Sequence, residues 1–322
     1  MKHELPPNSE QPTAASDPRP GARWDLDRLV AGLRVSREET HSIRKDGVIH
    51  RPPSREALAQ VISALTEALF PRHYGQYDLD AENIDYFVGQ RLSVALDLLS
   101  DQIHRAALFV GDELSPGFHQ PEAIELTRTF AARLPAVRGI LINDLRAAFV
   151  GDPAAKSFPE ILIGYPGMTS VIHHRLAHIL YGLNARLIAR LFAEIAHART
   201  GIDIHPGASI GSGFFIDHGT GVVIGETAVI GDNVRIYQAV TLGARHFPTD
   251  DDGRLIKGDA RHPIVEDDVI IYAGATILGR IVVGRGSTIG GNVWLTHDVP
   301  PNSVVTQASL RNKVGGNSLE KP

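Results

Sequence analysis

The feature that most constrains the fold is a six-residue repeat of aliphatic side chains in the last third of the chain. A period of six fits neither an amphipathic helix nor an ordinary alternating strand. It is typical of a parallel β-helix coiled as a triangular prism, in which each short strand points one aliphatic side chain inward. A two-residue slip follows residue 222 and a long interruption follows residue 242. The repeat positions are Ile204, Ile210, Ile216, Val222, Ile224, Ile230, Ile236, Leu242, Val265, Ile271, Ile277, Val283, Ile289 and Leu295.

Three such hexads make one coil, so the repeat predicts about four to five coils. The position after the aliphatic residue is often small or acidic, as at Gly211, Asp217 and Gly225, and a small residue lets the chain turn a corner. We interpret the aliphatic positions themselves simply as core. The flat faces of such a prism favour association of identical chains into closed rings.

The first two hundred residues predict helices. Apolar residues recur at helical spacing, and Ser54 is placed to cap the first clear segment, which Pro71 ends. Further segments open near Ile84, at Pro121, at Pro135 and near Thr169. Of the 31 glycines, 17 fall in residues 201–300, which marks the main boundary. The expected organisation is a tail (1–22), a helical domain (23–200), a β-helix (201–305) interrupted at 244–263, and a second tail (306–322).

Composition excludes several classes of function. Lys and Arg number 32 against 37 Asp and Glu, a net charge of −5, whereas a nucleic-acid binder is normally basic. Cysteine is absent, which excludes disulfides, a thiol nucleophile and a Cys-ligated zinc site. No stretch approaches the apolar length of a membrane span, and the proline-rich residues 1–22 lack the apolar core of a signal peptide. We therefore expect a disordered N-terminal tail and a cytoplasmic protein.

Polar residues break the repeat at residues 201–207, at residues 216–221 and in the excursion 244–263. Asp203 and His218 are 15 residues apart, close to one coil, so they could lie on adjacent coils within hydrogen-bond reach. A carboxylate beside an imidazole is the general-base arrangement that activates a hydroxyl. The alternative is that Asp217 and His218 merely turn a corner.

The excursion itself has two notable features. Asp252-Gly253 predicts a hairpin turn, and the neighbouring aspartates lack the ligand spacing of an EF-hand, so a solvated tip is favoured over a calcium site. Arg261 stands where the excursion rejoins the prism. Its planar guanidinium suits a substrate carboxylate.

These interruptions resemble the motifs of one family. The motifs are Asp203-Ile-His-Pro-Gly, Asp217-His-Gly-Thr-Gly, Val240-Thr-Leu-Gly and Arg261-His-Pro, preceded by Asn143-Asp-Leu-Arg and Gly151-Asp-Pro-Ala. Over about residues 140–305 the chain is similar to the bacterial serine O-acetyltransferases, which are hexapeptide-repeat acyltransferases. The resemblance implies an α+β fold, an N-terminal all-helical domain followed by a left-handed parallel β-helix.

The resemblance also implies a reaction. Acetyl would move from acetyl-CoA to the hydroxyl of L-serine, and the product O-acetyl-L-serine would feed cysteine synthesis. His218 would be the general base and Asp203 its orienting partner. No metal is implied, because a thioester is attacked without one.

The remaining implied roles concern binding of the substrate and the coenzyme. Asp152 and Asp217 would hold the ammonium group of serine, and Arg261 would clamp its carboxylate with His262 beside it. A zwitterion needs anions at one end and a cation at the other, which fits this set. Coenzyme A would lie along the prism, near Gly243, Ala273, Gly274 and Ala275.

Two partners are implied. One is a further copy of the chain, in a trimer or a dimer of trimers. The other is O-acetylserine sulfhydrylase, whose active site receives the C-terminal isoleucine of many family members. This chain ends Glu320-Lys321-Pro322 instead, which argues against that complex.

Three alternatives stay open at this point. A γ-type carbonic anhydrase would hold zinc with histidines such as His205, His218 and His262. Another acetyltransferase on the same prism would accept a sugar or an amine. A non-catalytic trimeric scaffold would not need Asp203 and His218 to pair.

Overall fold

The computed structural model of the protein describes residues 24–40, 50–75, 79–110, 119–246, 249–250, 252–256 and 258–307. The chain divides into two units, residues 1–50 and 51–322. The first unit contains one described helix, α1 (Leu26–Thr40). The predicted N-terminal tail and all but two residues of the predicted C-terminal tail lie outside the described residues.

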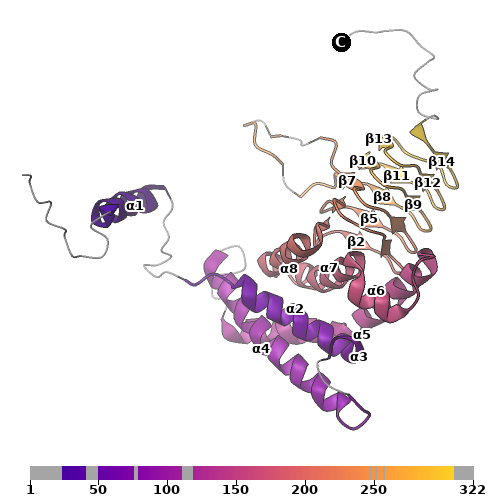
Figure 1. Ribbon diagram of the computed structural model, residues 1–322. Helices are drawn as coiled ribbons and strands as arrows, with labels where there is room; N and C mark the ends of the chain where they lie inside the picture. Colours follow the sequence, from indigo (N-terminus) through magenta and orange to yellow (C-terminus); the bar gives the residue numbers. More distant parts are fainter. Residues whose placement is uncertain are drawn as a thin grey trace, which may run out of the picture. The chain divides into compact units, whose positions relative to one another are not determined.

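The first half of the second unit is helical, as the apolar spacing predicted (Figure 1). Ser54 caps α2, because its Oγ accepts a hydrogen bond from the backbone N–H of Ala57 at 3.2 Å. Pro71 ends that segment and also begins the short helix α3. The helices are α2 (Arg55–Leu69), α3 (Pro71–Tyr74), α4 (Ile84–Val110), α5 (Gln120–Gly151), α6 (Phe158–Gly164), α7 (Pro166–Gly182) and α8 (Arg186–Thr200).

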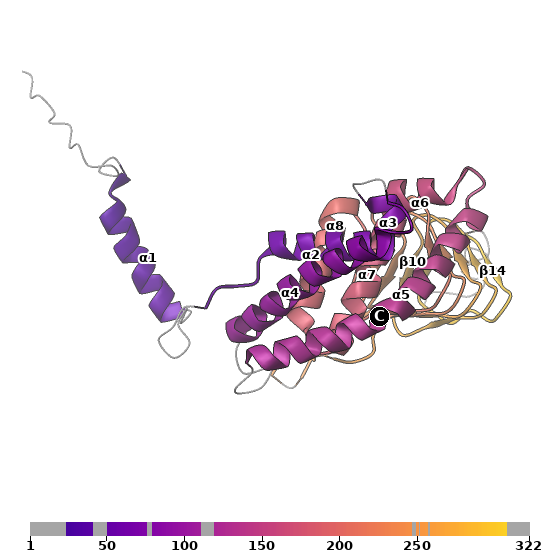
Figure 2. The same cartoon turned by 90° about the horizontal axis from the view of Figure 1, so that it is seen from below.

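One expectation for the helices was wrong. Pro121 and Pro135 were expected to open two separate segments, but both lie in the single long helix α5, with Pro135 in its interior (Figure 2). An internal proline removes one backbone hydrogen bond and normally bends or breaks a helix. Here the buried stripe runs unbroken across it, from Phe130 through Leu134 and Val137 to Leu141, and this packing favours a continuous helix.

The second half is a left-handed parallel β-helix of hexapeptide repeats. Its strands form three parallel sheets, ordered β1-β4-β7-β10-β13, β2-β5-β8-β11 and β3-β6-β9-β12-β14. The repeat positions are buried, apart from the half-buried Ile210, which confirms their assignment to the core. The strands are β1 (Asp203–Ile204), β2 (Ser209–Ile210), β3 (Phe215–Ile216), β4 (Val223–Ile224), β5 (Val229–Ile230), β6 (Arg235–Ile236), β7 (Thr241–Gly243), β8 (Ile264–Val265), β9 (Ile270–Ile271), β10 (Thr276–Leu278), β11 (Val282–Val283), β12 (Thr288–Ile289), β13 (Trp294–Leu295) and β14 (Val304–Val305).

The strand register shows how the two-residue slip is absorbed. Ile204 pairs with Ile224, whereas Ile224 pairs with Leu242 and Ile277 with Leu295. The first coil is therefore two residues longer than the regular coils of 18 residues that follow it. The extra residues fall in the turn after β3, which holds Asp217 and His218.

Two corners of the prism carry most of the residues that the sequence predicts for the site. The His218 corner joins the β3 sheet to the β1 sheet and consists of the turns at 217–222, 237–240, 272–275 and 290–293. The Arg261 corner joins the β1 sheet to the β2 sheet and consists of the turns at 205–208, 225–228, 244–263 and 279–281. The excursion leaves the prism here. The predicted turn at its tip is confirmed, since Gly253 N–H donates to the carbonyl of Asp250 and Thr249 bridges Leu255 in antiparallel fashion.

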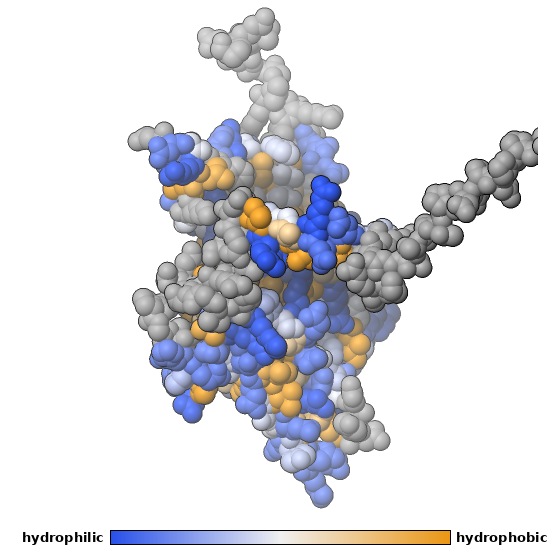
Figure 3. Space-filling view, turned by 90° about the vertical axis from the view of Figure 1, so that its left-hand side faces the viewer, coloured by the Kyte–Doolittle hydropathy of each residue, from blue (hydrophilic) through white to orange (hydrophobic). Residues whose placement is uncertain are grey.

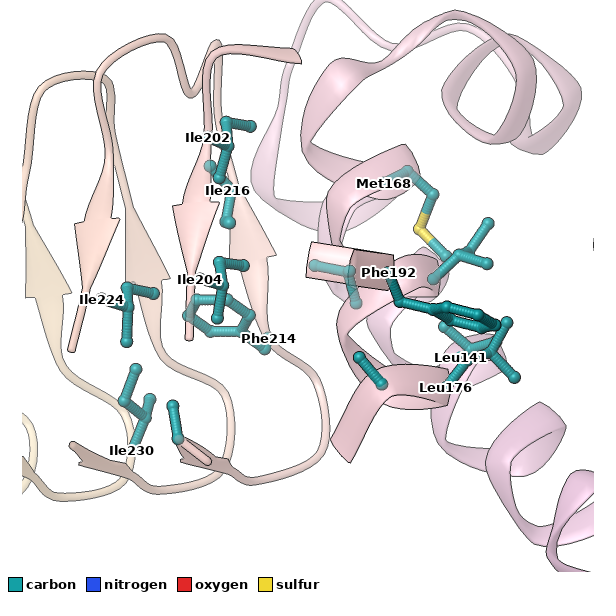
Figure 4. Packing of buried hydrophobic residues seen from close by; sticks show 14 of the residues in the cluster. Leu141, Met168, Leu176, Phe192, Ile202, Ile204, Phe214, Ile216, Ile224 and Ile230 are labelled. Carbon is teal, nitrogen blue, oxygen red and sulfur yellow. The ribbon is translucent and has the colours of Figure 1, made fainter. Parts of the chain in front are cut away.

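The helices and the prism share one hydrophobic core. Figure 4 shows Met168 and Phe192 packed among the helices beside Leu141 and Leu176, next to the first coil, which contributes Ile204 and Phe214 to the same core. A buried ion pair joins α5 and α7, where Nη2 of Arg175 lies 3.0 Å from Oδ1 of Asp144, and the backbone N–H of Phe214 in the first coil donates to the same oxygen at 2.9 Å. On the face shown in Figure 3, hydrophobic residues form small patches among hydrophilic ones. No helix in the described ranges is long and apolar enough to cross a membrane.

Candidate active site

His218 stands at the rim of the first coil with its ring in solvent. Its φ of 58° lies in the left-handed region, within the turn that carries the two extra residues of the first coil. The side chain is 71% exposed, and its Nδ1 lies 3.7 Å from Oδ1 of the half-buried Asp217. The imidazole is therefore accessible to a molecule bound outside the prism.

Asp152 comes to the same corner from the end of α5. Its Oδ2 accepts a 2.5 Å hydrogen bond from the hydroxyl of Tyr165, and its Oδ1 accepts one from the backbone N–H of Ala154. These two hydrogen bonds lower the pKa of Asp152, and positive charge on His218 and Arg235 lowers it further. The carboxyl group is therefore ionised beside His218.

Tyr165 also belongs to this cluster, although none of the sequence motifs includes it. Its hydrogen bond to Asp152 raises the pKa of its hydroxyl to about 12, and the charge of Asp217 contributes to the rise. The hydroxyl thus stays protonated and serves as a donor. We call Asp152, Tyr165, Asp217 and His218 the His218 cluster.

Two glycines allow the helices to come close enough to build this cluster. A Cβ on Gly167, in the first turn of α7, would lie 2.2 Å from the carbonyl oxygen of Ile216. A Cβ on Gly151, at the end of α5, would lie 2.7 Å from Nη2 of Arg235 and 2.9 Å from Phe215. Because both positions lack a side chain, the neighbouring Asp152 and Tyr165 reach the edge of the first coil.

Arg261 belongs to a second cluster, at the Arg261 corner. Its Nη2 donates to Oε2 of Glu226 at 2.8 Å, and the hydroxyl of Tyr181 donates to Oε1 of the same carboxylate at 2.9 Å. Partial burial opposes ionisation of Glu226, but hydrogen bonds from Arg261 and Tyr181 leave its pKa below the ordinary value. The side chain of Arg261 is about one-quarter exposed.

His262 lies next to Arg261 but is buried. Its ring rests on Gly225, where a Cβ would come within 2.0 Å of Nε2. The backbone N–H of Thr227 donates to Nδ1 at 3.1 Å, so the neutral ring carries its proton on Nε2. Burial, with help from the charge of Arg261, lowers the pKa of His262 to about 4. The ring is thus uncharged at neutral pH.

Asp203 lies on the face between the two corners. It pairs with Val223 in the β1 sheet, and the described part of the chain contains no hydrogen bond or ion pair between Asp203 and His218. Its charge instead acts on His205 of the Arg261 corner, whose pKa is lowered by burial while the charges of Glu226 and Asp203 oppose that shift. One side of the prism, about six extended residues or roughly 20 Å, separates the two corners.

The residues expected to contact the coenzyme are also divided between the two corners. Ala273, Gly274 and the buried Ala275 form a turn of the His218 corner, where Gly274 N–H donates to the carbonyl of Gln238. Gly243 ends β7 and pairs with Leu278, at the start of the excursion.

The histidines proposed for a zinc site also lie on both corners, with His218 on one and His205 and His262 on the other. Over the ranges that the structure describes, no three His, Asp or Glu side chains gather as metal ligands within one chain.

Comparisons with known proteins place the chain in a family. The family described as bacterial transferase hexapeptide (six repeats) matches residues 262–297. The Synechococcus elongatus protein named "serine acetyltransferase, plasmid" is 53% identical over 90% of this chain and 92% of its own length. A Mycobacterium tuberculosis serine acetyltransferase is 49% identical over 59% of this chain and 76% of its own.

Solved structures agree with this result. Entamoeba histolytica serine acetyltransferase 1, in complex with L-cysteine, aligns with a TM-score of 0.67 at 36% identity, over 87% of this chain and 99% of its own. The Neisseria gonorrhoeae enzyme in complex with serine aligns with a TM-score of 0.51 at 27% identity, over 76% of this chain and 94% of its own. Because the most extensive of these sequence matches spans nearly the whole of both chains, this chain belongs to the serine acetyltransferase family and is an acyltransferase.

Proposed function

We propose that the chain transfers the acetyl group of acetyl-CoA to the hydroxyl of L-serine, and that His218 is the general base. The product, O-acetyl-L-serine, would serve cysteine synthesis. The observation that supports this most directly is an exposed imidazole at a rim lined by the carboxylates of Asp152 and Asp217. The serine complex of the Neisseria gonorrhoeae relative supports serine as the acceptor.

The two clusters divide the recognition of serine between them. Asp152, held ionised, and Asp217 would bind the ammonium group next to His218. Arg261 would bind the carboxylate with its guanidinium, and His262 beside it would supply an uncharged N–H. Because both charged groups are carried by Cα and the hydroxyl by Cβ, holding the two charged groups in this way would leave the hydroxyl free to reach the imidazole.

The distance between the clusters requires a second copy of the chain. Serine is only about 5 Å long, so it does not span a prism side of roughly 20 Å. The site is complete where the Arg261 corner of one chain faces the His218 corner of the next. This contact joins two different surfaces, which gives a closed ring when the rotation between neighbouring chains closes, and a triangular prism favours a ring of three. Asp203, on the face between the two corners, would then approach the His218 of the neighbouring chain across the same contact.

The chemical steps need only groups on the chain and the two substrates. His218, uncharged, removes the hydroxyl proton as the serine oxygen attacks the thioester carbonyl. The tetrahedral intermediate then collapses, its C–S bond breaks, and the coenzyme thiolate takes the proton from His218. A carboxylate such as Asp203 would orient the ring and stabilise its protonated form between the two steps.

The test is release of the coenzyme thiol from acetyl-CoA with a panel of acceptors. The panel contains L-serine, D-serine, L-homoserine, ethanolamine and a hexosamine. We expect L-serine to react fastest by far and ethanolamine, which lacks the carboxylate, to react poorly. A sugar or simple amine that matches L-serine would overturn the proposed acceptor.

A further inference from the structure

Two tyrosines at the His218 corner form a stacked pair that has no role in the proposed acetyl transfer. The rings of Tyr237 and Tyr272 lie 5.1 Å apart between centroids with an interplanar angle of 13°. Tyr237 directly follows β6 and Tyr272 directly follows β9, just as Asp217 directly follows β3. Backbone hydrogen bonds connect these successive coils: Asp217 N–H donates to the carbonyl of Ile236, and Tyr237 N–H donates to the carbonyl of Ile271. The tyrosine pair therefore stands in one column with the acidic residue beside His218.

The pair is open to solvent next to an unused acceptor. Tyr272 is 41% exposed, although a large aromatic ring gains most from burial. Gln238, beside Tyr237, has a buried side-chain oxygen with no hydrogen-bond partner in the described part of the chain. A buried unpaired acceptor costs free energy, so its presence at an open corner points to a ligand that donates a hydrogen bond.

The direction of approach follows from what covers His218. The side toward the helices is taken by Asp152 and Tyr165, and α7 rests directly on β3 at Gly167. The acyl donor would therefore approach along the later coils of the corner, past Gln238 and Ala273. Neighbouring coils are about 4.8 Å apart, so the tyrosine pair lies roughly 5–10 Å along the prism from the level of His218. In acetyl-CoA, the pantetheine arm lies at this distance from the thioester, and the nucleotide lies further away.

We propose that Tyr237 and Tyr272 form a platform for the pantetheine arm of acetyl-CoA, and that the side-chain oxygen of Gln238 accepts a hydrogen bond from one of its amide N–H groups. The inference rests on the proposed acetyl transfer. The arm alternates methylene groups with amides, and a flat aromatic surface packs against both. The pair would thereby hold the thioester in place without touching the reacting atoms.

The experiment compares Tyr237→Ala and Tyr272→Ala with Tyr237→Phe and Tyr272→Phe. The alanine variants should raise the KM for acetyl-CoA and the Kd for CoA, measured by calorimetry, roughly five- to thirtyfold. The phenylalanine variants keep the aromatic face and should change both less than about twofold. The KM for serine should stay unchanged in all four. Tyr86→Ala, at an exposed position on α4, is the matched control for loss of a surface tyrosine.

A shortened donor tests which part of the coenzyme is bound. S-acetylpantetheine lacks the nucleotide. The alanine variants should raise the KM for this donor by the same factor as they raise the KM for acetyl-CoA. Gln238→Leu should raise the KM of both donors roughly three- to tenfold. If alanine disrupts the coils, as judged by thermal melting, Tyr272→Gln removes the aromatic face while keeping bulk and carries the same test.

Several results would overturn the platform. One is an unchanged Kd for CoA in both alanine variants, and another is a loss that disappears with S-acetylpantetheine, which would assign the pair to the nucleotide. A third is dissociation of the oligomer with CoA affinity intact, which would make the pair a subunit contact. Absence of transfer by the unmodified chain would refute the proposed function instead, and CoA calorimetry would still report on the tyrosines.

Discussion

The hydroxyl of Tyr165 donates a 2.5 Å hydrogen bond to Oδ2 of Asp152 and so joins the residue before α7 to the end of α5, beside His218. The bond holds the carboxylate at the rim of the prism and favours its charged form. The helical domain thereby contributes directly to the His218 cluster, as it contributes Tyr181 to the cluster at the Arg261 corner.

Tyr165→Phe removes this donor and keeps the ring. Because a hydrogen bond to a charged group is worth about 1.5–3 kcal/mol and this site is partly solvated, we expect the KM for serine to rise roughly threefold to tenfold. The pKa of Asp152 should rise, so serine binding should weaken at a higher pH than in the unmodified protein. Steady-state kinetics across acidic pH measure both effects, with Tyr86→Phe as the control. An unchanged KM and pH profile would remove Tyr165 from the site.

His218→Ala should lower kcat by about 10²–10⁴, the usual contribution of a general base. Binding of serine and of CoA should change little, because the assigned ligands of both are other residues. Calorimetry with each substrate, alongside turnover, separates the two effects. A variant with near-normal kcat would show that another group takes the proton.

Arg261→Ala should chiefly raise the KM for serine. A hydrogen-bonded charge pair at a partly exposed site contributes about 1.5–3 kcal/mol, which predicts a rise on the order of 10- to 100-fold. Arg261→Lys should recover only part of the loss, since an ammonium group lacks the planar fork that matches a carboxylate. For ethanolamine, which has no carboxylate, the unmodified and Arg261→Ala proteins should react alike. Equal serine KM values would refute the clamp.

Acid should destabilise the helical part through His173, whose Nδ1–H donates to the carbonyl of Thr169. Burial lowers its pKa from 6.5 to about 4. The unfolded chain therefore binds a proton that the folded chain does not, so the stability present above pH 6.5 is lost progressively as pH falls toward 4. This difference between the pKa values of the unfolded and folded chain corresponds to roughly 3 kcal/mol of folding free energy.

His173→Gln removes this titration, so its Tm should depend less on pH between 6.5 and 4 than that of the unmodified protein. His197→Gln, at an exposed position on α8, is the matched control and should leave the slope unchanged. Parallel curves for the unmodified protein and the His173→Gln variant would show that His173 is protonated in the folded state.

The prism could be predicted from sequence because each inward position needs an aliphatic side chain, and that need repeats at a fixed period. The continuity of α5 across Pro135 could not, because it depends on packing along the whole buried stripe. The hydrogen bond from Tyr165 to Asp152 joins two helix ends, and the stacking of Tyr237 on Tyr272 spans the excursion, so neither follows from local spacing.

The position of Asp203 relative to His218 could not be predicted from local spacing either. A spacing of 15 residues suggested adjacent coils, but the first coil is lengthened by its two-residue slip, and Asp203 pairs with Val223, beyond the turn that holds His218. Within one chain it therefore lies on the neighbouring face. Its proposed partnership with His218 depends on a contact between chains.

One site shared by two chains is tested most directly by mixing two variants, each of which is impaired in a different half of the site. Arg261→Ala and His218→Ala chains are unfolded together, refolded and assayed with L-serine at a concentration well below the KM of the Arg261→Ala protein. With random assembly, about a quarter of the contacts combine an intact His218 corner with an intact Arg261 corner, so about a quarter of the unmodified activity should return. Activity no greater than the mean of the two separate variants would contradict a shared site and place the whole reaction within one chain.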